Sequence, residues 1–115
     1  MLPLASLMLA LYTQTNPISI TACSTEPLVQ TVNAGDAMLL QQIGSQLQIS
    51  FTNAGPKTVR SVTFAVKHGS STTNIVDAGT FSIDAKISHD FDWSYVPDAV
   101  DCSVVAIQYA DGTTW

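Results

Sequence analysis

The strongest constraint on the fold is an alternation of apolar and polar residues between Leu47 and Val66. Residues 47–53 (LQISFTN) alternate at every step, residues 59–66 (VRSVTFAV) resume the pattern, and the intervening 54–58 (AGPKT) has turn chemistry. Successive side chains of a strand point to opposite faces, so each segment predicts a strand with one face on a core and one in water. Two such strands joined by a short loop predict an antiparallel hairpin and an all-β class.

Short apolar segments separated by turn residues continue along the chain. Further strands are expected at 18–23, 28–32, 75–81, 86–93 and 102–109. Residues 37–43 (AMLLQQI) fit a short helix or a strand, and the polar stretch 68–73 is expected to be a loop. The close spacing of turn signals predicts a single antiparallel β-sandwich of about seven strands.

The N-terminal segment predicts a leader. Residues 1–11 are apolar and uncharged, and they are shorter than the ~20 apolar residues that span a bilayer. This is typical of the apolar part of an export signal, although basic residues and an A-x-A site are missing. A helix or strand packed on the domain is the alternative. We expect a leader at 1–15, a sandwich domain at 16–115 and no transmembrane segment in the mature chain.

Cys23 and Cys102 are the two cysteines of the chain. Neither belongs to a C-x-x-C pair, and no histidine cluster completes a zinc site. In an exported protein such a pair predicts one disulfide, and two buried free thiols are the alternative. In a regular strand Cys102 shares a face with Val104, opposite the bulkier Val105 and Ile107. The bridge is then expected to attach an outer N-terminal segment rather than to connect two sheets.

The charge of the chain argues against nucleic acid as a partner. The net charge is −5, and the four basic residues (Lys57, Arg60, Lys67 and Lys86) are scattered along the sequence. A surface of this sign repels phosphate backbones. Charged residues make up only 11% of the chain, a composition that suits an exported β-protein, so we expect a secreted or periplasmic location.

His89 is the residue that invites a catalytic interpretation. Ser88, His89 and Asp90 alternate between the two faces of one strand, so they cannot form a triad among themselves, and no G-x-S-x-G elbow is present. We expect His89 to be a partly buried, hydrogen-bonded residue at a sheet edge. His68, in its polar stretch, is expected to be solvated. The sequence predicts no catalytic residue and no enzymatic activity.

Several acidic residues lie close together in the sequence: Asp84, Asp90, Asp92, Asp98 and Asp101. Calcium needs several oxygen ligands that converge on one point, and the spacing matches no calcium-loop motif. We expect a solvated acidic edge, which resists edge-to-edge aggregation, and no metal or cofactor.

The candidate recognition residues are Trp93, Tyr95, Trp115 and His89. Exposed aromatic rings stack on sugars or anchor protein partners, and packing in the core or at its rim is the alternative. Coplanar exposed rings would favour a carbohydrate-binding domain. A deep pocket that holds His89 and an aspartate would favour a small hydrolase using residues 84–95. A bare, apolar edge strand would favour a protein partner.

Six segments together resemble a group of small exported bacterial proteins. They are 47–53, 59–66, 76–82 (VDAGTFS), 87–91 (ISHDF), 102–105 (CSVV) and 109–115 (YADGTTW). That group shares a D-x-G-x-F-S block, an I-x-H-x-F strand and a closing F/Y-A-D-G-S/T-x-W. The resemblance covers most of residues 18–115. It implies an immunoglobulin-like sandwich with a leader and no established activity.

The expected function is therefore a non-catalytic binding or structural module, with a protein or glycan partner at the envelope or outside the cell. The chain departs from the group at one turn. The group has a glycine after F-S, whereas Ile83 and Asp84 follow Ser82 here, so a different turn is expected.

Overall fold

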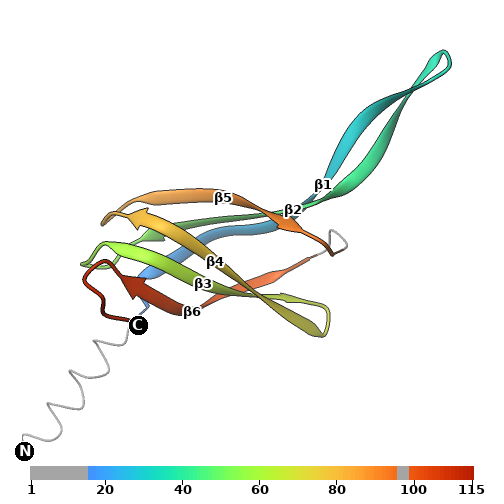
Figure 1. Ribbon diagram of the computed structural model, residues 1–115. Coiled ribbons are helices and arrows are strands. Elements are labelled where there is room, and N and C mark those ends of the chain that lie inside the picture. Colours follow the sequence, from blue (N-terminus) through green and yellow to red (C-terminus); the bar gives the residue numbers. More distant parts are fainter. Residues whose placement is uncertain (1–15, 96–98) are drawn as a thin grey trace, which may run out of the picture.

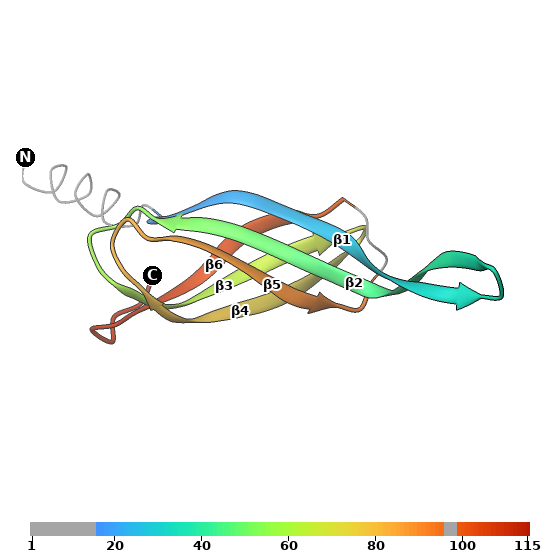
Figure 2. The ribbon, with the colours of Figure 1, turned by 90° about the horizontal axis from the view of Figure 1, so that it is seen from above.

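The computed structural model describes residues 16–95 and 99–115, which form two antiparallel three-stranded sheets (Figure 1). The strands are β1 (Ile18–Ala34), β2 (Ala37–Asn53), β3 (Val59–His68), β4 (Ser71–Phe81), β5 (Lys86–Trp93) and β6 (Asp101–Tyr109). One sheet has the order β1-β2-β5 and the other β4-β3-β6, and they stack on each other (Figure 2). The predicted all-β, antiparallel class is confirmed. The leader expected at 1–15 lies outside the described residues.

The core between the sheets is built from the predicted alternation of β2 and β3. The inward side chains of these strands are at most 1% exposed: Leu47, Ile49, Phe51, Val59, Val62, Phe64 and Val66. Phe51 has its ring centroid 5.3 Å from that of Phe64 and 5.3 Å from that of Phe81. Such tilted and edge-to-face pairs add about 0.5–1.5 kcal/mol each beyond the burial of apolar area.

The first hairpin is longer than the sequence predicts. The segments expected at 18–23 and 28–32 are one strand, β1, and residues 37–43 begin β2, so that each strand has 17 residues. Six strands therefore occupy the described residues, where about seven were expected. Gly35 and Asp36 join the two strands, and Gly35 has φ 65°. A glycine with positive φ at the first loop position is typical of a type II′ hairpin turn.

The outer half of this hairpin leaves the sandwich. β5 pairs with β2 only from Ser45 to Thr52, so within the described chain residues 28–44 pair only with each other, beginning with the Leu28–Gly44 pair at the base. We call residues 28–43 the arm, and Figures 1 and 2 show it projecting beyond the end of both sheets. The described residues extend 80 Å along their longest axis, against 31 and 20 Å across it. An extra residue in β2, Ile43, forms a bulge where the arm begins.

The polar stretch 68–73 is part of a hairpin, and the expected loop is wrong. His68 of β3 pairs with Ser71 of β4, and only Gly69 and Ser70 lie between them. Gly69 has φ 60°, which again fits a two-residue type II′ turn. Polar residues in this stretch are paired strand residues with one face in water, so their polarity does not distinguish a strand end from a loop.

Cys23 and Cys102 form a disulfide that connects the two sheets, with their Cα atoms 6.3 Å apart. Cys23 lies on β1 and Cys102 on β6, strands that belong to different sheets. Both residues are partly buried and pack against the core. The predicted disulfide is confirmed, whereas the expectation that it would not connect two sheets is wrong.

A bulge in β6 explains this difference. Phe64 of β3 pairs with Val104 and the preceding Thr63 pairs with Ala106, which leaves Val105 as an extra residue. A bulge inverts the alternation of inward and outward side chains along the strand. Val104 therefore faces the core before the bulge, Ile107 faces it afterwards, and Val105 is 49% exposed.

Asn53, the last residue of β2, organises the end of the sandwich opposite the arm. Its side chain is fully buried, and its amide nitrogen donates hydrogen bonds to the carbonyl oxygens of Lys57 (2.9 Å) and Phe81 (3.0 Å). Its amide oxygen accepts one from the Gly55 N–H (3.1 Å). One side chain thus satisfies backbone groups of two loops that would otherwise be buried without partners.

The turn after β4 is made without a glycine. The Ala85 N–H donates to the Ser82 carbonyl oxygen at 3.0 Å, and Asp84 has φ 65°. This combination fits a type II turn, in which aspartate tolerates the left-handed conformation better than most residues. The Asp84 N–H also donates to the Asn53 carbonyl oxygen at 2.7 Å, which attaches the turn to the end of β2.

Replacement of both cysteines by serine is expected to lower the free energy of unfolding by about 2–4 kcal/mol. The bridge joins residues 79 positions apart, and its loss frees a long loop of the unfolded chain. Urea unfolding of the wild type and of the Cys23→Ser/Cys102→Ser variant measures the difference. Reductant should destabilise only the wild type. Two alkylatable thiols in the oxidised wild-type protein would contradict the bridge.

Candidate functional site

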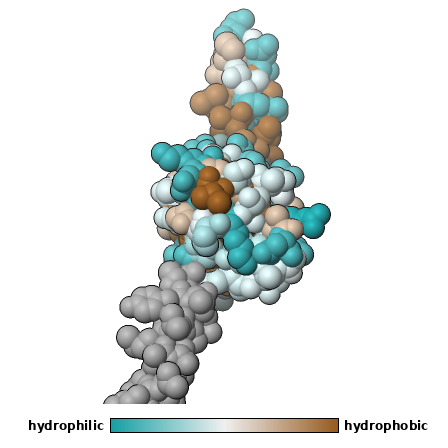
Figure 3. Space-filling model, turned by 90° about the vertical axis from the view of Figure 1, so that its left-hand side faces the viewer, coloured by the Kyte–Doolittle hydropathy of each residue, from teal (hydrophilic) through white to brown (hydrophobic). Residues whose placement is uncertain are grey.

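The arm exposes a group of large apolar side chains. They are Leu28, Val29, Met38, Leu39, Leu40 and Ile43, and the most exposed are Leu40 at 76% and Met38 at 73%. Asp36 at the tip is the only charged residue between positions 28 and 43. Single exposed apolar residues are normal, but a contiguous group of them marks an interaction site. Figure 3 shows apolar side chains gathered on the arm, above a mostly polar sandwich.

Both faces of the arm carry apolar side chains. From the cross-strand pairs, one face carries Val29, Thr31, Asn33, Met38, Leu40 and Gln42, and the other carries Gln30, Val32, Ala37, Leu39 and Gln41. Residues 37–44 are exposed without interruption, and the alternation of buried residues in β2 begins at Ser45. The arm therefore has no face on the core. A two-stranded hairpin of this kind is at best marginally stable alone in water.

The outer edge of β2 is bare along the arm. The last pair between β2 and β5 joins Ser45 to Trp93, and no described strand continues along this outer edge beside residues 37–44, which pair only with β1 on their other edge. An exposed, apolar strand edge presents unpaired N–H and C=O groups that are a template for another strand. The edge and the apolar side chains beside it form one candidate binding surface.

Trp93, Tyr95 and His68 form an aromatic cluster at the base of the arm. The His68 ring centroid lies 4.1 Å from that of Tyr95 and 5.1 Å from that of Trp93. Its Nε2 is 2.8 Å from Thr73 Oγ1. His68 is half-buried, so the expectation of a solvated side chain is wrong. Because His68 and Trp93 belong to different sheets, the cluster closes the end of the sandwich from which the arm projects.

The structure brings two of the candidate recognition residues together, but not as a flat platform. Trp93 is 4% exposed, and its ring meets that of Tyr95 at 63°. The Trp93 Nε1 atom has no hydrogen-bond partner among the described residues. Tyr95 is 46% exposed and supplies the accessible ring of the pair. Trp93 therefore serves mainly as a core residue that holds β5 at the base of the arm.

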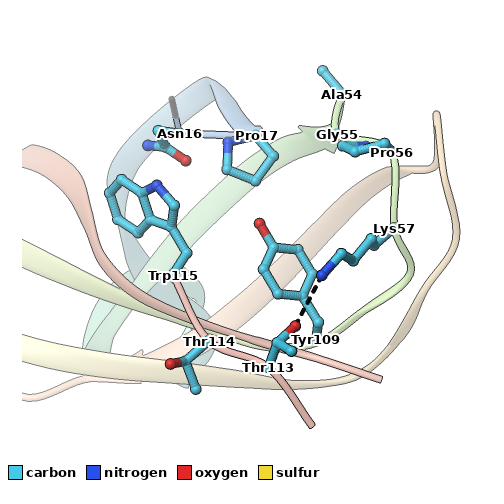
Figure 4. Close-up of a pocket in the computed structure, with 10 residues that line it drawn as sticks. All are labelled: Asn16, Pro17, Ala54, Gly55, Pro56, Lys57, Tyr109, Thr113, Thr114 and Trp115. Atoms are coloured by element: carbon cyan, nitrogen blue, oxygen red, sulfur yellow. Dashed lines mark hydrogen bonds between the residues drawn. The ribbon is translucent and has the colours of Figure 1, made fainter. Parts of the chain in front are cut away.

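Trp115 lies at the opposite end of the sandwich, in the wall of a pocket of about 640 Å³ (Figure 4). The backbone N–H of Trp115 donates to the Ile107 carbonyl oxygen at 2.9 Å, which holds the C-terminal segment beside β6. Pro17 and Tyr109 line the same pocket. At Gly55, another lining residue, a Cβ atom would come within 2.3 Å of the Pro17 Cβ, so the close approach of these loops requires glycine.

Asp111 and Lys57 form a small polar network beside this pocket. Lys57 Nζ lies 3.2 Å from Asp111 Oδ2 and 4.8 Å from the centre of the Tyr109 ring. The Thr113 hydroxyl and N–H both donate to Asp111 Oδ1. These hydrogen bonds, and then the nearby Lys57 ammonium, favour the carboxylate and lower the pKa of Asp111 to about 2.

His89 and Asp77 connect the sheets at the edge opposite the disulfide. His89 Nδ1 lies 2.6 Å from Asp77 Oδ2, and the side chains are 47% and 5% exposed. β4 and β5, which carry them, lie at the edges of different sheets. The expected hydrogen bond of His89 at a sheet edge is present, whereas the side chain is exposed rather than partly buried. Neither residue lines the pocket at the end of the sandwich.

The sequence did not indicate Asp77 as the partner of His89. The alternation along β4 could have indicated Asp77, because Asp77 lies on the same inward side of the strand as the partly buried Ile75. An aspartate in the apolar phase of a strand needs a polar partner, since an unpaired buried carboxylate is costly. The sequence does not specify that partner, which lies on the facing sheet.

The acidic residues near the C-terminal third do not converge. Within 16–95 and 99–115, no three His, Cys, Asp or Glu side chains are placed to hold a metal ion, and Asp98 lies outside these ranges. Among the described residues, no helix is long and apolar enough to cross a membrane.

The His89→Ala variant is expected to lose about 1–3 kcal/mol of unfolding free energy, because the buried Asp77 carboxylate would lose its partner. The double variant His89→Ala/Asp77→Ala should regain part of this loss, since no buried charge remains. Urea unfolding of the wild type and both variants measures these differences. A His89→Ala variant as stable as the wild type would show that the pair does not tie the sheets together.

The Asp111 carboxyl is expected to stay ionised down to about pH 2, and Thr113→Ala should raise its pKa towards 3.8. Because the folded pKa lies below the unfolded one, its stabilising contribution is complete above about pH 4 and is lost as the pH falls towards 2. Carboxyl NMR titration measures both proteins, with Ser103→Ala as the control. A wild-type midpoint near 3.8 would refute the network.

Comparison with known protein families, with curated proteins and with solved structures finds no match to this chain. What the protein does is therefore inferred from its own residues, and above all from the arm.

Proposed function

We propose that this protein is a non-catalytic binding module of the envelope or the extracellular space, and that the arm is its binding element. The observation that carries this proposal is the set of exposed apolar side chains on a projecting, almost uncharged hairpin. A surface of this kind costs free energy in water and is stabilised when a partner covers it.

The disulfide supports a location outside the cytosol. Bridges such as Cys23–Cys102 form and persist in oxidising compartments, and they are rare where thiols are kept reduced. The export leader that the sequence predicts at 1–15 would agree with this location.

The sheet orders support an immunoglobulin-like sandwich. The orders β1-β2-β5 and β4-β3-β6 correspond to strands A-B-E and C′-C-F of that fold. Residues 113–115 lie beside β6 through a bridge between Gln108 and Thr114, where a final strand G would begin. Folds of this kind present binding segments from a rigid body, as the arm is presented here.

A protein partner fits the arm better than a glycan does. Residues 28–43 contain no aromatic ring, whereas sugar platforms are built from exposed rings. The bare edge of β2 offers instead the main-chain hydrogen bonds of strand addition, and the flanking apolar residues give specificity. A hydrolase would need reactive groups converging in a pocket, and the His89–Asp77 pair lies away from the pocket at the sandwich end.

The test uses Leu40→Lys, which places a charge on the arm at a position that is 76% exposed and outside the core. The matched control is Val76→Lys on β4, where the wild-type residue is 59% exposed. Wild type and both variants are immobilised and offered envelope extract and culture medium. A protein bound by the wild type and the control, but about tenfold more weakly by Leu40→Lys in direct titration, is the expected result.

Circular dichroism and thermal unfolding of the three proteins confirm that each is folded. Equal binding of every partner by all three proteins would refute the arm as the binding element.

A further inference from the structure

We infer that the partner of the arm is a second copy of this chain, which pairs edge to edge along residues 37–43 of β2. This inference rests on the proposed function, because it takes the arm as the binding element. It adds the chemistry of the partner, namely another neutral strand of the same sequence in antiparallel orientation.

The outer edge of β2 lacks the features that keep strands apart. Edges that avoid pairing usually carry lysine, proline or an inward charge. Residues 37–44 contain none of these, whereas β1 has Glu26 and Pro27 at the base of its own outer edge. The bare part of β2 begins where β5 ends at Trp93, so an added strand would extend a sheet that already exists.

The same segment is complementary to itself. A two-fold axis perpendicular to the arm places residues 37–43 of two copies antiparallel, with the same face of each on the same side. With the axis at residue 40, the two Leu40 side chains lie opposite each other, Met38 lies opposite Gln42 of the other copy, and Leu39 lies opposite Gln41. The result is a four-stranded ribbon, which supplies the additional strands that an isolated hairpin lacks.

The distribution of charge favours this contact over others. The chain carries a net charge of −5, but the arm has only Asp36, so two copies that meet at their arms avoid bringing acidic sandwiches together. The projection of the arm beyond both sheets leaves room for this arrangement (Figure 1). A strongly charged partner would find only one charge on the arm, that of Asp36. A lipid bilayer would have to bury the amides of Gln30, Gln41 and Gln42 without hydrogen-bond partners.

The experiment measures the oligomeric state and the arm in the same samples. Sedimentation equilibrium of the full chain from about 1 μM to about 1 mM covers the range of weak to moderate dimers. Hydrogen exchange at both ends of this range reports the amides of residues 37–43. We expect the wild type to dimerise and these amides to exchange more slowly in the concentrated sample.

Leu40→Lys and Leu39→Lys place a charge on opposite faces of the same strand, and each is expected to weaken dimerisation at least about tenfold. Val76→Lys should dimerise like the wild type. A wild type that stays monomeric, or dimers that persist in both arm variants, would overturn the inference.

The outcomes also separate this inference from the proposed function. If the wild type stays monomeric while Leu40→Lys loses a purified protein partner, the second copy is excluded and the arm remains the binding element. If the wild type instead binds neutral phosphatidylcholine vesicles and Leu40→Lys does not, the partner is a lipid surface. If the wild type neither dimerises nor binds anything through the arm, both proposals fail.

Discussion

The packing of β2 against β3 is the interaction on which the rest of the structure depends. Phe51 and Phe64 meet at its centre, and every inward residue of the two strands is almost completely buried. β2 also runs on into the arm, so one strand supplies both the centre of the core and half of the candidate binding surface. The arm can project into water because its base is anchored in this core. An isolated hairpin of the same sequence would be at best marginally stable in water.

The two sheets are connected along each side of the sandwich by a different kind of interaction. The Cys23–Cys102 disulfide joins β1 to β6, and the His89–Asp77 pair joins β4 to β5. The two ends are closed as well, by the rings around Trp93 at the base of the arm and by the Asn53 amide at the far end. A small core gains from such ties, since a domain of this size buries a limited fraction of its surface.

The accuracy of sequence-based inference varied with what each residue faces. Alternation predicted β2 and β3 correctly where one face meets the core, and it located His89 at a sheet edge. It could not reveal the bulge at Val105, because pairing with β3 decides where the extra residue goes. It also missed the arm, because a strand with no face on the core does not need to alternate apolar and polar residues. The partner of His89 was hidden for a third reason: Asp77 lies on the facing sheet, and no local pattern encodes contacts across a core.

The bulge at Ile43 has a consequence for how this protein can vary. Leu28 pairs with Gly44, whereas the next residue, Val29, pairs with Gln42, so the pairing register changes between the body and the arm. Residues added or removed in pairs beyond this point shift no side chain of the core from one face to the other. The arm is thus free to lengthen, shorten or change its side chains while Leu47, Ile49 and Phe51 keep their places. A chain built in this way can acquire a new specificity without a new fold.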